Sequence, residues 1–393
     1  MSVHDQVVDL ARGAEPVAVE WFGTSLRVHI PVPETLQYVA DHHRVDPATV
    51  KAPKYRSAAL FAVAAPDILD QLRAQAARGT VSRRESFKGV WYAYWETADG
   101  ATMVVDETHA YQHALLTRDF ASWAVVGERP EDLGLVVART IRELVREDLL
   151  AMGAVTFHAS AAELPDGTGV LLTGGSGAGK TTTAVRIGCS GGRVIGTDRS
   201  FLLRHDGEWL VVGLPETTRL GLGGARTLGL LGLVEGRVLS REQTLLARPG
   251  TPGKEAKLTL NNGEMTELLN CGYTPAATAD SIVVLSGSPP ASAPRMKDLA
   301  PAEAHRALRE HLLAPDPDYR ARWLSPDPAQ EDAGSAAAEL SALLTRQPAR
   351  RLTWNPQLHC DERVVPLLTA RTDTTPSSAA HRPDRNSGKE AIR

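Results

Sequence analysis

Residues 156–188 read TFHASAAELPDGTGVLLTGGSGAGKTTTAVRIG, and this stretch decides the fold of the chain. Its middle eight residues, 174–181, fit the G-x-x-x-x-G-K-[ST] pattern of a phosphate-binding loop. The apolar run 169–174 predicts a buried strand before the loop, and the residues after the loop predict a helix that ends at Gly188. A strand, a glycine-rich loop and a helix in this order predict an α/β core that binds a nucleoside triphosphate.

The residue types in the loop suit a phosphate ligand. Glycine lets successive backbone N–H groups point at the β-phosphate, and the helix that follows presents the positive end of its dipole to the same charge. We expect Lys180 to reach the β- and γ-phosphates and Thr181 to coordinate Mg²⁺. The expected nucleotide contacts are Gly174, Gly175, Ser176, Gly177, Ala178, Gly179, Lys180, Thr181 and Thr182. ATP is the expected nucleotide and GTP is the alternative, because no motif in the chain specifies the base.

A carboxylate and a histidine lie on the predicted strands beside the loop. Asp198 ends the predicted strand 193–198, where it could hold Mg²⁺ directly or through water, or take a proton from an attacking hydroxyl. The alternative is a turn residue paired with Arg199. His158 lies on the predicted strand 155–162, where its ring could orient a nucleophile or a carboxylate, or serve structure alone. The candidate catalytic residues are Asp198, His158 and Lys180, and the candidate metal ligands are Thr181 and Asp198.

The segment after Asp198 predicts a mixed sheet. FLLRHDGEWLVVG, residues 201–213, is two apolar runs around Asp206-Gly207, which predicts a β-hairpin. A doubly wound parallel sheet would instead have a helical crossover at this point. A loop at 247–258 follows, and we expect its cations to close over the transferring phosphoryl group and exclude water. These cations are Arg248, Lys254 and Lys257.

The N-terminal third predicts a β-rich α+β domain. SLRVHIPV, residues 25–32, alternates apolar and polar side chains with the period of a half-buried strand. Four aromatic residues on another predicted strand would fill the sheet core or, alternatively, stack on a base or sugar; they are Trp91, Tyr92, Tyr94 and Trp95. The aromatic strand is 90–97, and the further predicted strands are 59–65, 102–107 and 122–127, with a turn at Asp99-Gly100.

Changes of pattern divide the chain into five segments. The strand 281–287 is the last clear strand, and short Ala- and Leu-rich helices follow at 300–314 and 334–346. The final residues lack the apolar content to fold. The predicted segments are a β-rich N-terminal domain at 1–130, a connecting helix at 131–152, a core with the phosphate-binding loop at 153–300, a C-terminal helical extension at 301–370 and a disordered tail at 371–393.

Composition excludes several classes of partner. The chain has 393 residues, 42% of them hydrophobic, which is enough for a sizeable core. Its net charge of −4 combines 43 basic with 47 acidic residues, so no overall basic field favours nucleic acid or an anionic membrane. No apolar run approaches the length of a membrane span, and the first residues lack the apolar core of a signal peptide. Cys189, Cys271 and Cys360 form no C-x-x-C pair, which argues against disulfides and a zinc site and favours the cytoplasm.

Three segments together resemble the catalytic core of HPr kinase/phosphorylase: FHASAA, GTGVLLTGGSGAGKTTTA and GGRVIGTDRSFLL. In that family a histidine and small residues precede a strand, then G-x-S-G-x-G-K-[ST], then a strand that ends in acidic residues. TRLGLGG, residues 218–224, is similar to the R-G-L-G segment of the family. The likeness covers roughly residues 153–290. Two positions depart from it: Thr197 precedes Asp198 where the family has paired acids, and Thr182 stands where the family has Glu.

The resemblance implies a mixed-sheet fold, which the family shares with phosphoenolpyruvate carboxykinase. It also implies that Lys180 and Thr181 contact phosphate and metal and that Asp198 is the catalytic carboxylate with His158 beside it. Because HPr kinases assemble as hexamers, it implies a homo-oligomer.

Three functional hypotheses follow from the sequence. The first is an ATP- and Mg²⁺-dependent kinase that phosphorylates a hydroxyl of a small molecule, a peptide or a protein serine, with the N-terminal domain selecting the acceptor. The second is an NTPase in which nucleotide binding and hydrolysis switch a partner interaction. The third is a decarboxylating enzyme like phosphoenolpyruvate carboxykinase. The hairpin at 201–213 favours the first over the second, because a switch ATPase usually continues with alternating strands and helices.

Overall fold

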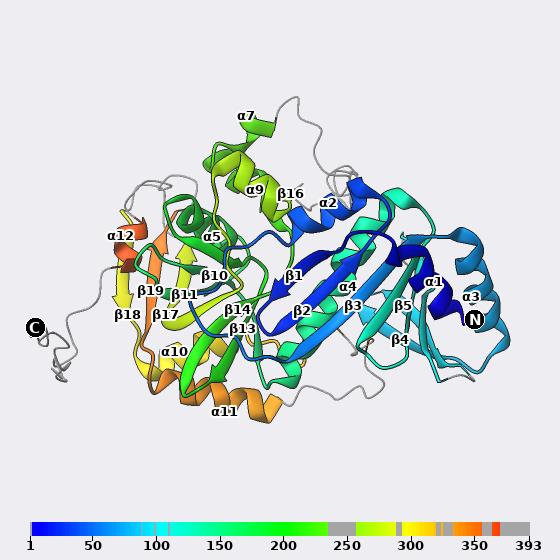
Figure 1. Cartoon of the computed structure of the whole chain (residues 1–393). Coiled ribbons are helices and arrows are strands. Elements are labelled where there is room, and N and C mark those ends of the chain that lie inside the picture. The colour runs from blue at the N-terminus through cyan, green and yellow to red at the C-terminus, as the bar shows by residue number, and fades with distance from the viewer. Residues whose placement is uncertain are drawn as a thin grey trace, which may run out of the picture.

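The computed structural model of the chain places two large β-sheets side by side (Figure 1). The sheets and the helices packed on them make an α/β protein, as predicted. The residues that the structure describes are 2–87, 89–97, 100–108, 111–234, 257–287, 293–319, 324, 333–355 and 364–369.

The N-terminal domain is an eight-stranded mixed sheet in the order β1-β2-β3-β8-β7-β6-β5-β4. Its strands are β1 (Val17–Trp21), β2 (Thr24–His29), β3 (Arg56–Ala64), β4 (Ser82–Phe87), β5 (Val90–Glu96), β6 (Thr102–Asp106), β7 (His113–Thr117) and β8 (Ser122–Gly127). Its helices are α1 (Val3–Arg12), α2 (Pro33–His42) and α3 (Pro66–Arg78). The five predicted strands are present as β2, β3, β5, β6 and β8, whereas β1, β4, β7 and the three helices were not predicted.

The aromatic strand β5 contributes to the sheet core. Tyr92, Tyr94 and Trp95 are buried, as the core interpretation predicted, whereas Trp91 is 40% exposed. Strands β5 and β6 pair as antiparallel neighbours, so the chain turns between them, although Asp99 of the predicted turn lies outside the described residues.

Helix α4 (Pro130–Ala151) connects the two sheets, as predicted. Pro130 begins it, acidic residues follow in the first turn, and Gly153 lies just beyond its end with φ +86°. One apolar cluster runs from the N-terminal sheet through α4 to strands β13 (Arg199–His205) and β14 (Glu208–Gly213) of the second sheet. The indole Nε1 of Trp21 also donates to the carbonyl oxygen of Gly213, at 2.9 Å. The two domains therefore share a core.

The second sheet is mixed, which confirms the expectation from the hairpin. Its main path is β12-β10-β11-β17-β14-β13-β9, in which β11 and β17 are parallel and β13 and β14 form the predicted hairpin at Asp206-Gly207. Both turn residues have positive φ, at 50° and 84°, which a two-residue hairpin of this type requires. The remaining strands are β9 (Val155–His158), β10 (Ser160–Glu163), β11 (Gly169–Gly174), β12 (Arg193–Gly196) and β17 (Ala276–Gly287).

Helices cover both faces of this sheet. One face packs on α10 (Pro301–Arg309) and α11 (Ala333–Leu344), which lie along the lower edge of the molecule in Figure 1. The other face packs on α5 (Lys180–Cys189) and α12 (Val364–Thr369). Because its strand β11 is covered on both faces, every residue of it is buried.

The structure corrects two predictions about this region. The predicted strand 155–162 is two strands, because Ala159 ends the pairing of β9 with β13 and the chain then enters β10, which pairs with β11 and β12. The segment 301–370 is not solely helical, since β19 (Ala349–Trp354) pairs in parallel with β17 and β18 (Arg295–Asp298) pairs with β19. Strand 281–287 was therefore not the last, and the tail 371–393 lies outside the described residues.

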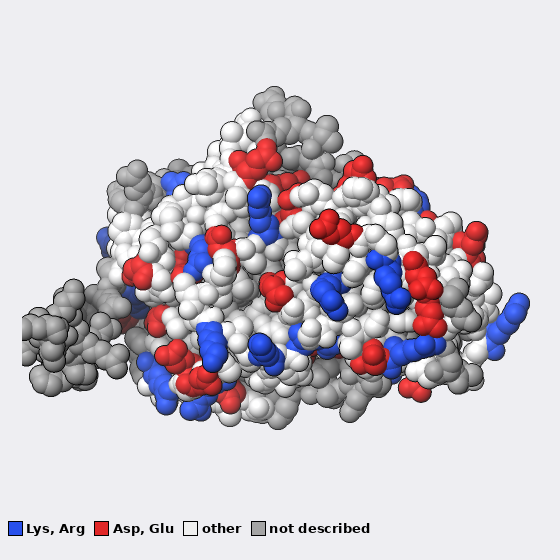
Figure 2. Space-filling model, in the orientation of Figure 1, with Lys and Arg blue, Asp and Glu red and all other residues white. Residues whose placement is uncertain are grey.

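The glycine-rich segment after β14 packs beside α5. It forms β15 (Thr218–Gly221), α6 (Leu222–Thr227) and α7 (Leu230–Val234), and β15 pairs with β16 (Lys257–Leu260), which α9 (Asn262–Leu269) follows. On the face of the molecule in Figure 2, basic and acidic side chains are intermixed over both domains.

Candidate active site

Three glycines give the loop between β11 and α5 its shape. Gly174, Gly177 and Gly179 have φ of +145°, +77° and +92°, values that side chains other than glycine rarely adopt. A Cβ on Gly174 would also lie 2.5 Å from the carbonyl oxygen of Leu285 on β17. The loop therefore stays close to the sheet, and Gly179 turns the chain directly into α5.

Lys180 lies across this loop at the start of α5. Its ammonium donates to the carbonyl oxygens of Gly174, at 2.8 Å, and Gly175, at 3.3 Å. Burial lowers the pKa of Lys180, the charge of Lys257 lowers it further, and Asp198 opposes both. The cation is thus held at the loop, where the charge of Asp198 acts on it.

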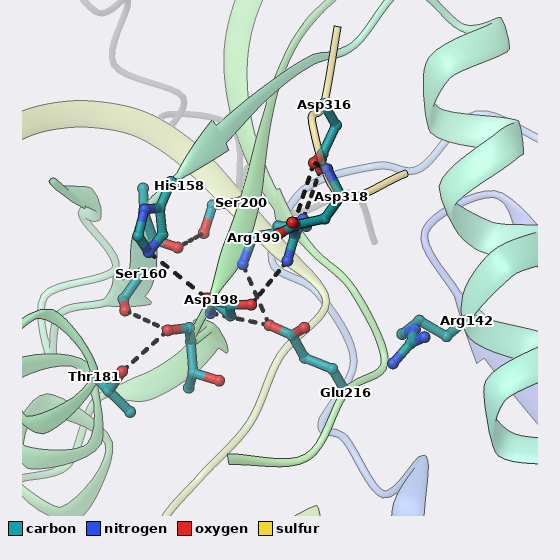
Figure 3. A network of polar contacts seen from close by, with 12 residues as sticks. Arg142, His158, Ser160, Thr181, Asp198, Arg199, Ser200, Glu216, Asp316 and Asp318 are labelled. Atoms are coloured by element: carbon teal, nitrogen blue, oxygen red, sulfur yellow. Dashed lines mark hydrogen bonds and ion pairs between the residues drawn. The ribbon is translucent and has the colours of Figure 1, made fainter. Parts of the chain in front are cut away.

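The carbonyl oxygen of Thr197, the residue before Asp198, joins three elements. Figure 3 shows the side chains of Ser160 and Thr181 near Asp198. The hydroxyl of Thr181, on α5, donates to this carbonyl oxygen at 3.1 Å, and the hydroxyl of Ser160, on β10, donates to it at 2.8 Å. Thr197 follows β12 directly. These bonds fix the backbone that carries Asp198 against the start of the helix.

Asp198 lies in the short connection between β12 and β13. The sequence had predicted it as the last residue of a strand, which ends two residues earlier. Its Oδ2 accepts from Nη1 of Arg199 at 2.8 Å, and its Oδ1 lies 3.7 Å from Nε2 of His158. Both side chains of the latter pair are nearly half exposed. Burial lowers the pKa of His158, and the charge of Lys180 lowers it further, so the ring is mostly neutral at pH 7. The structure thus brings together His158, Lys180, Thr181 and Asp198.

Glu216 is a second carboxylate at this place, which sequence reasoning missed. Its Oε1 accepts from the backbone N–H of Asp198 at 3.0 Å and from that of Arg199 at 3.4 Å. Burial raises the pKa of Glu216 to about 7, and the charge of Asp198 raises it further against the opposing charges of Arg142 and Arg199. The sequence has Thr197-Asp198 where the family that it resembles has paired acids, and in the folded chain a second acid, Glu216, comes from the segment after β14.

The hairpin contained the signal that could have found Glu216. Ser200 pairs with Gly213 in the antiparallel register. Continuing that register by two residues on each strand places Asp198 opposite Pro215, next to Glu216. The predicted hairpin therefore already implied an acid beside Asp198.

Arg199 is anchored by residues more than a hundred positions away. It donates through Nε to Asp316 at 2.6 Å and through Nη2 to Asp318 at 2.8 Å, and its guanidinium lies 4.8 Å from the ring centre of Tyr319. These three residues lie in the segment predicted as a helical extension, and no local pattern marks them. They hold the arginine that in turn binds the carboxylate of Asp198.

Two cavities meet at Asp198. The first, of about 270 Å³, lies over the loop and the start of α5. Its lining residues are His158, Ser176, Gly177, Gly179, Lys180, Thr181, Thr182, Thr197, Asp198, Arg219, Leu220, Gly221, Gly223, Gly224, Thr227 and Lys257. Gly224 matters for its shape, because a Cβ there would lie 2.7 Å from Oγ1 of Thr182. Helix α6 can therefore approach the first turn of α5 closely.

The second cavity, of about 460 Å³, lies between the two domains. Its lining residues are His42, Tyr111, His113, Leu135, Val136, Ala138, Arg139, Arg142, Thr181, Thr197, Asp198, Arg199, Pro215, Glu216, Thr217, Arg219, Lys257 and Tyr319. The residues common to both cavities are Thr181, Thr197, Asp198, Arg219 and Lys257. A ligand in either cavity can therefore reach the carboxylate of Asp198.

Some of the other residues predicted from the sequence line the cavities, and others lie outside the described residues. Thr182 lines the first cavity, whereas the side chain of Ala178 packs against the apolar cluster under the loop. Lys257 lines both cavities, and its closure over a phosphoryl group stays a prediction. Arg248 and Lys254 lie outside the described residues.

The oxygen atoms of Asp198 and the neighbouring Thr181 suit a Mg²⁺ ion that enters with a nucleotide. Within the described ranges, no group of three or more His, Cys, Asp or Glu residues could hold a metal ion by itself. Mg²⁺ is usually bound by one or two carboxylates together with phosphate oxygens and water. Thr181 gives its hydroxyl hydrogen to Thr197, which leaves its oxygen lone pairs free, and Asp198 offers carboxylate oxygens. These residues fit a metal ion that is held jointly with phosphates.

Of the comparisons with known proteins, the comparison with solved structures gave matches. No protein-family model matches the chain, and no curated protein matches it. Among solved structures, it is similar to the HPr(Ser) kinase/phosphatase from Coxiella burnetii, with 14% sequence identity and a TM-score of 0.24 over 54% of this chain and 84% of that chain. The likeness is distant. Across the described residues, no helix has the length and apolar character needed to cross a bilayer.

Proposed function

We propose that this protein is a kinase that uses ATP and Mg²⁺ to phosphorylate a hydroxyl group. The observation that carries the proposal is the meeting of the two cavities at Asp198. A phosphoryl transfer needs a donor and an acceptor on opposite sides of the transferring group, with a carboxylate near the attacking oxygen. The loop cavity suits the donor and the cavity between the domains suits the acceptor.

The nucleotide binds in the first cavity, with its β-phosphate against the N–H groups of the glycine-rich loop. Before nucleotide binds, Lys180 donates to the carbonyl oxygens of Gly174 and Gly175. A phosphate oxygen is a stronger acceptor for an ammonium than a neutral carbonyl is, so Lys180 turns to the β- and γ-phosphates when ATP enters. Mg²⁺ bound with the nucleotide neutralises charge on these phosphates, and Thr181 and Asp198 supply oxygen atoms that would hold it.

In the transfer step the acceptor hydroxyl oxygen attacks the γ-phosphorus. Its proton passes to the carboxylate of Asp198, the bond from the γ-phosphorus to the bridging oxygen breaks, and ADP leaves with the negative charge on its β-phosphate. Lys180 and the loop N–H groups stabilise that charge. Arg199, anchored by Asp316 and Asp318, keeps the carboxylate of Asp198 in place.

Water must be kept from the γ-phosphate if the enzyme is to transfer and not hydrolyse. The acceptor cavity lies between two domains that share an apolar core, and Arg219 and Lys257 line both cavities where they meet. An acceptor in place displaces water from the attacking position. ATP consumption should therefore depend on the acceptor.

The test is to incubate the protein with γ-labelled ATP and Mg²⁺, with and without fractions of a cell extract, and to analyse products by phosphorus NMR. We expect ADP and a phosphate ester in equal amounts, and little ADP without acceptor. Full-rate release of ADP and free phosphate without acceptor, with no ester in any fraction, would refute the kinase and favour a nucleotide switch.

A further inference from the structure

We propose that the second cavity recognises a small acceptor by an anionic group, a carboxylate or a phosphate, which Arg139 and Arg142 bind while the acceptor hydroxyl lies at Asp198. This inference rests on the proposed kinase function and names the chemical class of its acceptor.

Helix α4 presents one face to the cavity. The residues of α4 that line it are Leu135, Val136, Ala138, Arg139 and Arg142. Positions three and four apart lie on the same side of a helix, so the side chains of Arg139 and Arg142 leave α4 on one side, about one turn apart. Such a pair can grip a carboxylate or phosphate from two directions.

Arg139 has an unmet hydrogen-bond donor. Its Nε is buried and has no hydrogen-bond partner among the described residues. A buried charged donor without an acceptor is unfavourable. An anionic group in the cavity would supply the acceptor.

Arg199 also lines this cavity, but its hydrogen-bond donors have acceptors. Asp198, Asp316 and Asp318 accept from it, so its donors are already engaged. Arg142 is intermediate: it donates to Glu143 through Nε at 3.3 Å and through Nη2 at 3.0 Å. Of these three arginines, Arg139 on α4 is therefore the one with a buried donor that an anion could pair with.

The charges of the cavity lie in an order that suits such an acceptor. The acids Asp198 and Glu216 lie where the cavity meets the loop, and Figure 3 shows Arg142 reaching from α4 toward Glu216. Arg139 lies three residues earlier on α4, about 4.5 Å along the helix axis. An acceptor that places its hydroxyl at Asp198 can then extend its anionic group past Glu216 toward Arg139.

The size and walls of the cavity fit a small molecule. Small-ligand sites are commonly about 300 to 1,000 Å³ in volume, and this cavity of about 460 Å³ lies within that range. Leu135, Val136 and Ala138 add an apolar wall for the carbon skeleton of the acceptor.

The experiment measures anion binding by titration calorimetry with the protein loaded with Mg²⁺ and a non-hydrolysable ATP analogue. Loading keeps anions out of the nucleotide cavity. The probes are glycerate, glycerol 3-phosphate and uncharged glycerol, which share hydroxyl groups and differ in charge. We expect at least one anion to bind about tenfold or more tightly than glycerol. A preference for glycerate would indicate a carboxylate acceptor, and one for glycerol 3-phosphate a phosphate acceptor.

Variants of Arg139 decide whether the preference arises in this cavity. Arg139→Gln should lose it by about tenfold or more, whereas Arg139→Lys, which keeps the charge, should retain part of it. Arg204→Gln is the matched control, because Arg204 is exposed toward the turn of the β13–β14 hairpin and lines neither cavity, and it should bind the anions normally. If Arg139→Gln does not fold, the comparison of Arg139→Lys with wild type decides.

Equal binding of the three probes, or undiminished anion binding by both Arg139 variants, would overturn the inference. So would γ-label that appears only in the protein fraction of an extract. In each of these cases the kinase stands if the analogue binds and an ester forms. Failure of the wild-type protein to bind the analogue at all would overturn both proposals.

Discussion

The two cavities at Asp198 are built in different ways. The loop cavity draws most of its lining from residues 176–198 and 219–227, whereas the cavity between the domains takes residues from His42 to Tyr319. The first combines the loop, the start of α5 and the turn after β12 with β15 and α6, all within one domain, and the second exists only once two sheets and α4 have packed together. In the proposed kinase, the phosphate site would therefore depend mostly on residues close in the chain, and the acceptor site on long-range assembly.

The strongest test of this difference is Lys180→Ala, which changes the loop cavity alone. Loss of the ammonium removes the cation between the β- and γ-phosphates, and turnover should fall on the order of a thousandfold. The fold should remain, because the side chain bonds only loop carbonyls. Turnover of ATP and circular dichroism on the same sample check this. Unchanged ATP consumption by a folded variant would show that the loop does not bind the reacting phosphate.

Asp198→Asn changes the point that both cavities share. It keeps the shape of the side chain and removes its charge, so kcat should fall by about a hundredfold. Nucleotide affinity should change much less, because Lys180 and the loop N–H groups remain. Steady-state rates and nucleotide titration separate the two effects. Wild-type kcat would make Asp198 a turn residue that only pairs with Arg199.

A pair of variants at Thr181 sharpens the metal assignment. Thr181→Ala removes the hydroxyl that bonds Thr197 and faces both cavities, so the Mg²⁺ concentration for half-maximal activity should rise by about tenfold. Thr181→Ser keeps the hydroxyl and should behave nearly as wild type. Rates over a Mg²⁺ titration provide the measurement, and equal Mg²⁺ dependence in all three proteins would remove Thr181 from the metal site.

The pH profile tests the carboxylate that the tertiary structure adds. Because the pKa of Glu216 is raised to about 7, its ionised form appears as pH rises through that value. We expect kcat/KM to rise over the same interval, since the ionised carboxylate places a second negative charge beside Asp198 for the metal ion of the nucleotide. Glu216→Gln should lose this limb of the profile. A profile in Glu216→Gln that keeps the limb would assign it to another group.

The same residue predicts the smallest effect, on stability. A carboxyl whose pKa is raised on folding from 4.5 to about 7 favours the folded state less and less as pH rises from 4.5 to 7. Since the residue keeps some exposed surface, Glu216→Gln should raise the free energy of unfolding at pH 8 by on the order of 1 kcal/mol. The gain should largely vanish at pH 5. Denaturant titrations at both pH values measure it, and a gain equal at both would contradict the linkage.

Much of the core could be predicted from patterns of neighbouring residues. The strand and helix on either side of the loop, the hairpin at Asp206-Gly207 and helix α4 all follow from local periodicity and turn chemistry. Strands such as β7 and β19 escaped prediction, because their place is fixed by the strands beside them. Ala159 gave no sign that it divides two strands, since the division is set by which partner each half pairs with.

The sequence by itself determined the glycine-rich loop, its lysine and the order of elements around it, because backbone freedom and helix dipoles act between residues close in the chain. Only the tertiary structure decided that Glu216 lies beside Asp198, that Asp316 and Asp318 anchor Arg199, and that arginines of α4 line the cavity between the domains. Those contacts join residues from 18 to 119 positions apart. They form only when strand register and the shared apolar core bring distant charges together, which no local pattern records.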